Sequence, residues 1–456
     1  MATALPRIDV AREFLDELLR VSASEGGGVV RIAYGQGEQE AHEALRGIGG
    51  RHGFPVEQDF AGNTYVRLKG RDSAAKCVVI GSHLDSVPHG GNYDGALGVA
   101  IGLAAIAGIA ASGRILDRDV LVMGVRAEES CYFPAPYIGS RMALGDLPAH
   151  TFNSLKRSDT GRGLADHMRE LGFDPAAVLR GDRHLSADTV ACYLEAHIEQ
   201  GPVLENEGIP LGIVQAIAGG PRWREGRIYG TYAHAGGAPK GYRQDAVAAL
   251  GEFIHQVNRL WDRFHEEGIY TLFTFGIIGT VPEMHTYSRV PGEARFCLDT
   301  RCIDPDIRGR IDREIKEIAQ GISARHGVAF EWGPDSGPNI SPMRPTCRPG
   351  YSRRRSVWAC PTRQWPAARA TTPRPSRTWA SRRPCCSSGT RTAAIIRMKP
   401  CGWKMCSLAP RCLPSSCARS SITLRAAETC TWSYNEMRRS RTTTPRASAR
   451  CSRPWM

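Results

Sequence analysis

The spacing of hydrophobic and polar positions changes along the first 340 residues of the chain, which predicts a mixed α/β fold. Cys77–Gly81 and Val120–Val125 are short apolar runs that predict buried strands, and the Gly- and Ala-rich stretch Gly95–Ser112 between them predicts a buried helix. This order is typical of a βαβ unit with parallel strands. Polar residues directly after these strands are therefore candidates for a functional site, because open α/β sheets bind ligands at the carboxyl ends of their strands.

The pattern changes again near residue 211. Three strands and two amphipathic helices are predicted beyond it, over Glu225–Ala233, Val247–Phe264, Leu272–Ile278, Ala294–Asp299 and Asp306–His326. Two helices with several strands, and a single histidine at a strand end, predict a separate α+β module.

The composition of this part predicts a cytoplasmic enzyme. Met1–Arg7 leads directly into an amphipathic pattern, so we expect no signal peptide. Gly95–Ser112 is too rich in Gly and Ala to favour a membrane span, so we expect no membrane partner. The five cysteines before residue 345 show no paired spacing, as is typical of a reducing compartment.

The charge is divided between two unlike parts. The 456 residues have a net charge of +13, which by itself suggests a binder of nucleic acid or of an anionic surface. Residues 345–456, however, hold 23 basic and only two acidic side chains, with 10 of the 15 cysteines and 6 of the 9 tryptophans. The other 344 residues have a net charge of −8, so we expect no nucleic acid as a partner.

The stretch from His83 to Asp94 has the composition of a metal site. His83 follows the first predicted strand, Asp85 stands two residues later, and Asp94 lies in a glycine-rich loop. In such an arrangement the imidazole binds a metal, the near carboxylate orients the imidazole, and the loop carboxylate can bridge two cations. Taken alone, these residues are equally typical of a hydrogen-bonded histidine with loop-capping aspartates.

Glu128 and Glu129 follow the second predicted strand and strengthen the metal hypothesis. Adjacent carboxylates in a crevice repel each other unless a cation or a proton separates them. One can then bind metal while its neighbour takes the proton from the attacking water. The alternative is an exposed acidic turn. His197 is a candidate fourth ligand, although a lone histidine at such a place is more often structural.

These motifs occur in a specific order between Arg12 and Asn339. They are His83-x-Asp85 with Asn-Tyr-Asp94-Gly, Glu128-Glu129, His197-Ile-Glu-Gln200-Gly-Pro, His234-Ala-Gly, and Arg243-Gln-Asp-Ala. Together they resemble the hydantoinase/carbamoylase amidases, which include N-carbamoyl-L-amino-acid hydrolases, allantoate amidohydrolases and β-ureidopropionases, within the dinuclear-zinc aminoacylase/carboxypeptidase group. A dipeptidase or aminoacylase on the same scaffold is the nearest alternative.

The resemblance implies a zinc-exopeptidase-like α/β catalytic domain with an inserted α+β, ferredoxin-like lid that also forms a homodimer. We expect the catalytic domain in residues 1–212, the lid in 213–332, a return to the catalytic domain in 333–344, and a separate tail in 345–456. The implied cofactors are two divalent metal ions, either zinc or manganese, cobalt or nickel. The implied reaction is cleavage of a carbamoyl or ureido C–N bond in a small carboxylate.

The resemblance also implies a role for each matching residue. The implied metal ligands are His83, Asp94, Glu129 and His197, with Asp94 as the bridge. Glu128 is the implied general base, Asp85 orients His83, and His234 stabilises the oxyanion. The implied substrate contacts are Gln200, Arg243, Ser288 and Arg301. Of these, Arg301 pairs with the substrate carboxylate, the alternative being a salt bridge on the lid surface.

Two positions depart from the family pattern. Ser288 stands about where many members place a substrate-contacting Asn, and Tyr132-Phe133 replaces an Arg-Phe pair. Both differences leave the chemistry intact and leave the exact substrate open.

Residues 345–456 lack the last two family motifs, a Ser-Gly-Ala-Gly-His-Asp-Ala loop and a Gly-Ser-His-Asn-Pro run that supplies the last metal ligand. Codons built from the third base of one residue and the first two bases of the next allow both motifs, over Pro366–Pro373 and Arg391–Met405. We interpret the tail as a frameshift at about residues 339–351. A basic tail that binds nucleic acid is the weaker interpretation, because such tails are Lys-rich and poor in Trp and Cys. A truncated, catalytically dead product remains an alternative to an active enzyme.

Sequencing the DNA around codons 335–355 tests the frameshift. We expect that one added or removed base restores a frame that encodes both missing motifs. A verified gene in which no single-base change yields them would contradict the interpretation.

Overall fold

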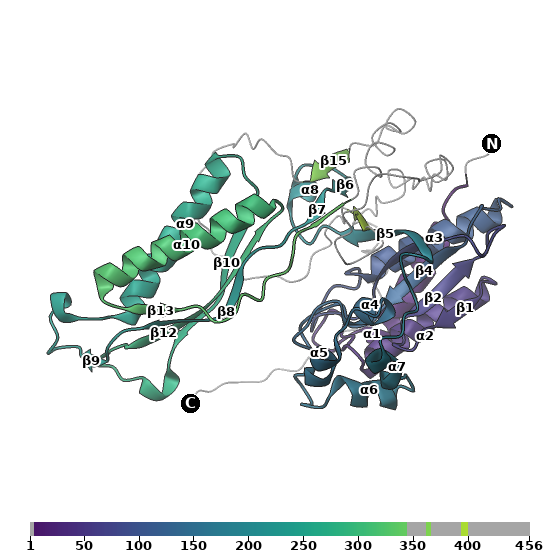
Figure 1. Cartoon of the computed structure of the whole chain (residues 1–456). Helices are drawn as coiled ribbons and strands as arrows, with labels where there is room; N and C mark the ends of the chain where they lie inside the picture. The colour runs from purple at the N-terminus through teal and green to yellow at the C-terminus, as the bar shows by residue number, and fades with distance from the viewer. Residues whose placement is uncertain (1–3, 344–361, 366–393, 400–456) are drawn as a thin grey trace, which may run out of the picture.

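The computed structural model describes residues 4–343, 362–365 and 394–399, which form two lobes (Figure 1). The lobe that holds the N-terminus is built on a sheet with the strand order β1-β2-β4-β3-β5-β16-β6-β15. Its strands are β1 (Val56–Gln58), β2 (Thr64–Leu68), β3 (Cys77–His83), β4 (Val120–Val125), β5 (Val190–Ile198), β6 (Leu211–Val214), β15 (Thr362–Trp365) and β16 (Ala394–Lys399).

The predicted βαβ unit is confirmed. β3 pairs in parallel with β4 and with β5, and α3 (Ala96–Ala111) connects β3 to β4. The helix lies so close to β5 that a Cβ atom on Gly98 would come within 2.2 Å of the carbonyl oxygen of Ala196. The glycine and alanine content therefore reflects tight packing on the sheet. Among the helices that the structure describes, none combines the length and apolarity that a membrane span needs.

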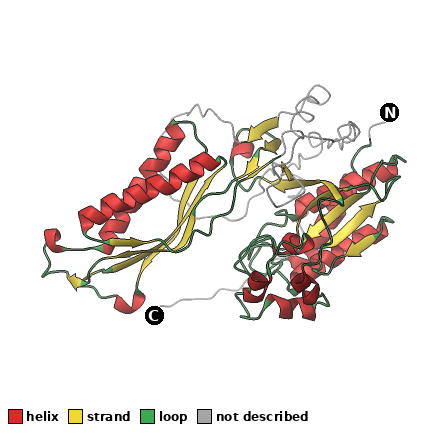
Figure 2. Ribbon diagram, viewed as in Figure 1, coloured by secondary structure: helices red, strands yellow, loops and turns green. Residues whose placement is uncertain are grey.

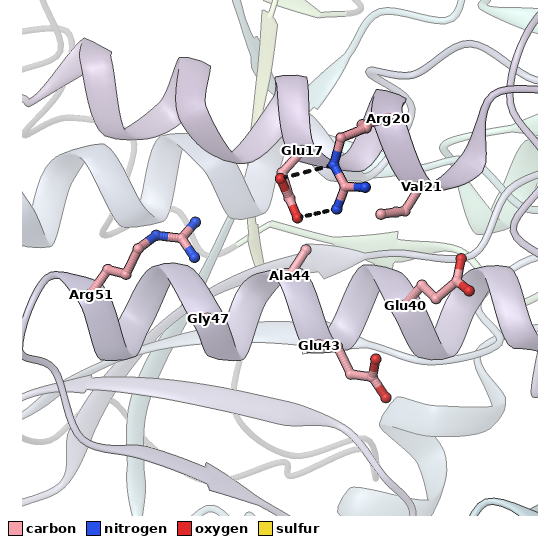
Figure 3. A pocket seen from close by; sticks show the side chains of 8 residues that line it. All are labelled: Glu17, Arg20, Val21, Glu40, Glu43, Ala44, Gly47 and Arg51. Carbon is pink, nitrogen blue, oxygen red and sulfur yellow. Dashed lines mark hydrogen bonds and ion pairs between the residues drawn. The ribbon is translucent and has the colours of Figure 1, made fainter.

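Helices cover both faces of this sheet. On one face α1 (Ile8–Ser22), α2 (Gln36–Arg51) and α3 share a core that includes Ile80 and Val122. On the other face Ala143 of α4 (Ile138–Ala143) packs with Val79 and Leu121 of the sheet. The short helices α5 (Ala149–Ser154), α6 (Leu164–Glu170) and α7 (Pro175–Arg180) contact one another. A groove between α1 and α2 is lined by side chains of both charges (Figure 3).

The second lobe has the α+β architecture that the sequence predicts. Its main elements are β8 (Arg222–Tyr229), α9 (Ala246–Glu266), β10 (Thr271–Thr280), β12 (Glu293–Cys302), α10 (Pro305–His326) and β13 (Ala329–Glu331). The antiparallel sheet has the order β10-β12-β8-β13, which is the ferredoxin-like βαββαβ arrangement. Figure 2 shows both helices on one side of this sheet, where an aromatic core includes Phe253 and Phe296.

One predicted strand is displaced. The strand predicted over Glu225–Ala233 is observed as β8, which ends at Tyr229. The reason lies at Gly230, where the carbonyl oxygen of Gln244 approaches so closely that a Cβ atom would meet it at 2.0 Å. The ladder between β8 and β12 ends one residue earlier, at Tyr229.

The chain enters and leaves the second lobe side by side, because β7 (Ala216–Ile217) pairs with β14 (Ser341–Pro342). β9 (Ala233–His234) pairs with β11 (Arg289–Val290). The remaining short helices are α8 (Val203–Asn206), η1 (Lys240–Tyr242) and η2 (Pro282–Met284). The domain limits given above stay a prediction. The frameshift hypothesis falls mainly on residues 345–361, 366–393 and 400–456, which lie outside the described residues.

Candidate metal centre

Three neighbouring strands bring the predicted ligands together at their carboxyl ends. His83 ends β3, His197 is the penultimate residue of β5, and Asp94 lies shortly before α3. Ligand atoms of these three side chains all lie within 4.8 Å of one another. His83 forms a second such group with Glu128 and Glu129, which follow β4. The four predicted ligands and the predicted base therefore share one place in the fold.

Asp94 lies between the two histidines. Its Oδ1 is 3.2 Å from Nε2 of His197 and 3.9 Å from Nε2 of His83. Nδ1 of His83 lies 3.0 Å from the carbonyl oxygen of Asp85, and Nδ1 of His197 lies 2.9 Å from that of Ile198. A histidine that donates Nδ1–H to a carbonyl presents Nε2 as its ligand atom. Both imidazoles thus present Nε2 toward the same carboxylate.

Asp85 is fully buried and ties the loop after β3 to the turn after β4. Its Oδ1 accepts a hydrogen bond from the N–H of Glu128, and its Oδ2 accepts one from the N–H of Glu129, each at 3.0 Å. The same carboxylate lies 3.4 Å from Nδ1 of His83. Asp85 therefore contacts both the imidazole and the backbone of the two glutamates, whereas the sequence suggested only the first contact.

Negative charge is concentrated around His83. Burial lowers the pKa of His83, but the hydrogen bond with Asp85 and the charges of Glu128, Asp85 and Asp94 outweigh it and raise the pKa to about 10. Burial raises the pKa of Glu129 to about 7, opposed by His83 and assisted by the other carboxylates. A buried imidazole that holds a proton so firmly marks a place where a cation is stabilised.

The predicted lid residues lie apart from this centre. His234 is exposed in β9, and Figure 1 shows β9 at the end of the second lobe that is away from the first lobe. Arg243 donates to the carbonyl oxygens of Ala235 at 2.5 Å and Ala238 at 2.7 Å. The carbonyl oxygen of Ser288 accepts from the N–H of Ala235 at 2.8 Å. In this structure Arg243 and Ser288 therefore shape the loop that carries His234.

The other two predicted substrate contacts have partners within the chain. Arg301 donates Nε and Nη2 to Oδ2 of Asp299 at 3.2 and 2.9 Å, and Arg222 binds the same carboxylate. Gln200, with a φ of +55°, donates its amide to both oxygens of Asp94 at 3.0 and 3.1 Å. The substrate-contact role of these two side chains stays a prediction.

Sequence reasoning missed Glu38 on α2 and Arg126 after β4. The two form a fully buried ion pair at 3.1 Å beside the turn that carries Glu128 and Glu129. The signal in the sequence is a glutamate within the apolar stripe of α2, at helical spacing from Ala41 and Leu45. Its partner follows 88 residues later, and no local pattern connects the two.

The groove between α1 and α2 is a separate feature. Its lining residues are Glu17, Arg20, Val21, Glu40, Glu43, Ala44, Gly47 and Arg51 (Figure 3). None of them belongs to the metal-binding groups, so the groove has no part in the candidate centre.

Comparisons with known proteins agree with this geometry. Residues 63–154 match Peptidase family M28. The N-carbamoyl-L-amino acid amidohydrolase of Geobacillus stearothermophilus is 34% identical over 318 residues, which cover 69% of this chain and 74% of that protein. The allantoate amidohydrolase of Bacillus subtilis is 28% identical, with 69% and 74% covered.

Solved structures show the same fold. The hydantoinase/carbamoylase family amidase from Burkholderia ambifaria matches with a TM-score of 0.69 at 27% identity, and the match covers 79% of this chain and 85% of that chain. The corresponding amidase from Burkholderia multivorans has a TM-score of 0.70 at 26% identity, over 80% and 85% of the two chains. The chain belongs to the hydantoinase/carbamoylase family of amidohydrolases.

Proposed function

We propose that this chain is a metal-dependent amidohydrolase that cleaves the C–N bond of an N-carbamoyl amino acid or an allantoate-like substrate. The observation that carries the proposal is the convergence of two imidazoles and three carboxylates at the ends of neighbouring strands. Relatives named N-carbamoyl-L-amino acid amidohydrolase and allantoate amidohydrolase support this substrate class. These relatives favour this class over the alternative, a dipeptidase or aminoacylase on the same scaffold, which is the second candidate.

The residues fit two divalent metal ions. His83, Asp94 and His197 form one ligand group, and Glu129 belongs to the other, where Glu128 lies beside it as the base rather than as a ligand. The surplus of negative charge that raises the pKa of His83 to about 10 favours a cation in the same place. Imidazole with carboxylate suits zinc, manganese, cobalt or nickel. Asp94 would take the bridging role that the family resemblance implies, and its Oδ1 lies 3.2 Å from Nε2 of His197 and 3.9 Å from Nε2 of His83.

Each residue of the centre then has a chemical task. Bound divalent ions polarise the scissile carbonyl and lower the pKa of water. Glu128 takes a proton from the attacking water and returns it to the leaving nitrogen, while Asp85 holds its backbone in place. His234 stabilises the oxyanion, and Arg301 binds the substrate carboxylate. Contact between His234 and the centre requires a closing motion of the lid or the lid of a second copy.

The replacement Glu128→Gln should abolish hydrolysis while metal content stays at the wild-type level, because the amide keeps the shape but cannot accept the proton. We expect turnover to fall by about 10²- to 10⁴-fold. Assays of N-carbamoyl-L-amino acids, allantoate and dipeptides with Zn²⁺, Mn²⁺ or Co²⁺ measure turnover, and elemental analysis measures metal content. Glu40→Gln on α2 is the control.

Three other results of these assays would change the assignment of the base or of the function. Retained turnover in Glu128→Gln would exclude this residue as the base. Faster hydrolysis of dipeptides than of carbamoyl substrates would favour the second candidate. A wild-type chain that binds metal and hydrolyses none of the substrates would favour the catalytically dead product.

Metal binding should release a proton from His83. Because the metal-free pKa is about 10, the imidazole is protonated between pH 7 and 9 and has to lose its proton before Nε2 binds an ion. The apparent affinity therefore rises about tenfold per pH unit in this window and levels off above the pKa. Calorimetry in buffers of different ionisation enthalpy measures the released proton. An affinity that is independent of pH in this window would contradict the ligand role of His83.

We also propose that two copies associate through the lid. β10 is an edge strand of the lid sheet, and it exposes Ile277 and Ile278 to 66% and 57%. An exposed apolar edge strand pairs readily with another chain. Pairing of the β10 strands of two copies would cover these side chains and continue the sheet.

Ile278→Lys should convert the dimer into a monomer, because a lysine on an edge strand opposes pairing. Light scattering after size-exclusion chromatography gives the molar mass. Ile115→Lys is the matched control, since Ile115 is 60% exposed on the first lobe. A monomeric wild-type chain, or a monomer produced equally by the control, would contradict the lid interface.

We place the reaction in the cytoplasm. No disulfide joins the described cysteines Cys77, Cys131, Cys192, Cys297 and Cys302 to one another. Cysteines that form no disulfides are typical of a reducing compartment.

A further inference from the structure

The N–H groups of the turn after β4 are held by side chains. Its four successive N–H groups, residues 126–129, each donate to a side-chain oxygen at 2.7–3.0 Å. The acceptors are, in order, Asn63, Glu38 and the two oxygens of Asp85. The carbonyl oxygens of residues 126–128 accept from the N–H groups of residues 137–139 at 3.0 Å. Contacts on both sides therefore set the direction in which Glu128 and Glu129 point.

Glu38 is the acceptor in this set that comes from a helix, α2. It is fully buried and uses both oxygens. Oε1 accepts from the N–H of Ala127 at 2.7 Å, and Oε2 accepts from the N–H of Tyr34 at 2.7 Å and from Arg126 at 3.1 Å. All three neighbours are donors, so the surroundings match an ionised carboxylate.

Arg126 keeps Glu38 in place because it is itself enclosed. Its guanidinium donates to the carbonyl oxygen of Gly62 at 2.7 Å and to Oε1 of Gln39 at 2.6 Å. The guanidinium carbon also lies 4.7 Å from the ring centre of Phe173. A cation held from several sides cannot follow a displaced carboxylate, so the pair is a rigid connection between α2 and the turn.

Ala127 shows why the turn needs this connection. Its φ is +47°, a left-handed conformation that is unfavourable for a residue with a Cβ atom. The N–H of this same residue donates to Glu38. Loss of the acceptor would let Ala127 relax toward ordinary backbone and turn the next two side chains, Glu128 and Glu129, away from His83.

We propose that Glu38 is a positioning residue of the metal centre, which holds the turn through Ala127 so that Glu128 and Glu129 face His83. The inference rests on the proposed function, because it gives Glu38 a part in metal binding. It concerns only the ligand group on the turn. The group of His83, Asp94 and His197 includes no residue of the turn and should not depend on Glu38.

Glu38→Gln tests this sharply. Both carboxylate oxygens accept hydrogen bonds, so the amide NH₂ of glutamine meets a donor in either orientation. Glu38→Asp keeps the charge beside Arg126 but shortens the reach to Ala127, and it is measured in parallel. Glu40→Gln is the matched control, because it makes the same change on the same helix, in the groove of Figure 3.

The first measurement is hydrogen exchange of the metal-free full chain at pH 8. Burial raises the pKa of Glu38 to about 7, opposed by Arg126, so the carboxylate is ionised at this pH. We expect peptides that span residues 126–129 to exchange at least about tenfold faster in both Glu38 variants than in the control, while peptides of β3 and α10 keep wild-type rates. Unchanged exchange in the turn, or equal acceleration everywhere, would overturn the proposal.

The second measurement is a calorimetric titration with Co²⁺, with Glu129→Gln and His197→Ala as references. Each reference variant identifies one Co²⁺-binding step by weakening it. In the step that Glu129→Gln weakens, we expect Glu38→Gln to lower the affinity about 10- to 100-fold. In the step that His197→Ala weakens, we expect Glu38→Gln to bind Co²⁺ with wild-type affinity. Equal weakening of both steps, or of neither, would overturn the proposal. A wild-type chain that binds no metal would contradict the proposed function, and the exchange of the turn would still decide the role of Glu38.

Discussion

The carboxylate of Asp85 is the contact on which the centre depends. It is fully buried, it accepts the amide protons of Glu128 and Glu129, and it lies 3.4 Å from the imidazole of His83. A buried carboxylate is costly unless donors surround it, and here the donors belong to the groups that have to be held in place. The register of the parallel strands β3 and β4 pairs His83 with Val125, so the residues that follow the two strands lie at the same edge of the sheet. The hydrogen bonds of Asp85 therefore both stabilise this buried carboxylate and set the geometry of the ligands.

Two buried arginines extend this arrangement to the N-terminal segment. Arg31 donates to the carbonyl oxygen of Leu84 at 2.6 Å and to Oδ1 of Asn92 at 3.2 Å, both in the loop that runs from His83 to Asp94. Arg126 secures Glu38 beside the turn after β4. Buried cations also moderate the repulsion among the acids of a carboxylate-rich centre. The helix α2 and the segment that precedes it thus hold both ligand loops.

Much of the fold could be predicted because strand and helix patterns are local. The strand predicted over Val120–Val125 and the ferredoxin-like lid are both observed. The predicted ligands gather because polar residues that follow parallel strands meet at one edge of a sheet. The lid contacts were harder to predict. Arg243 donates to the backbone of its own loop, and Arg301 pairs with Asp299. The sequence alone does not show whether an arginine contacts a substrate or a neighbouring residue.

By itself the sequence determined the order of the elements and the chemistry at the strand ends, because both follow from residue types within short segments. Only the tertiary structure decided that Glu38 reaches Ala127 across 89 residues and that Asp85 joins two strand ends. It also decided that His234 lies away from the centre it is assigned to (Figure 1). Such contacts depend on how segments far apart in the sequence pack against one another. A local sequence pattern does not show how close two such segments lie in the folded chain.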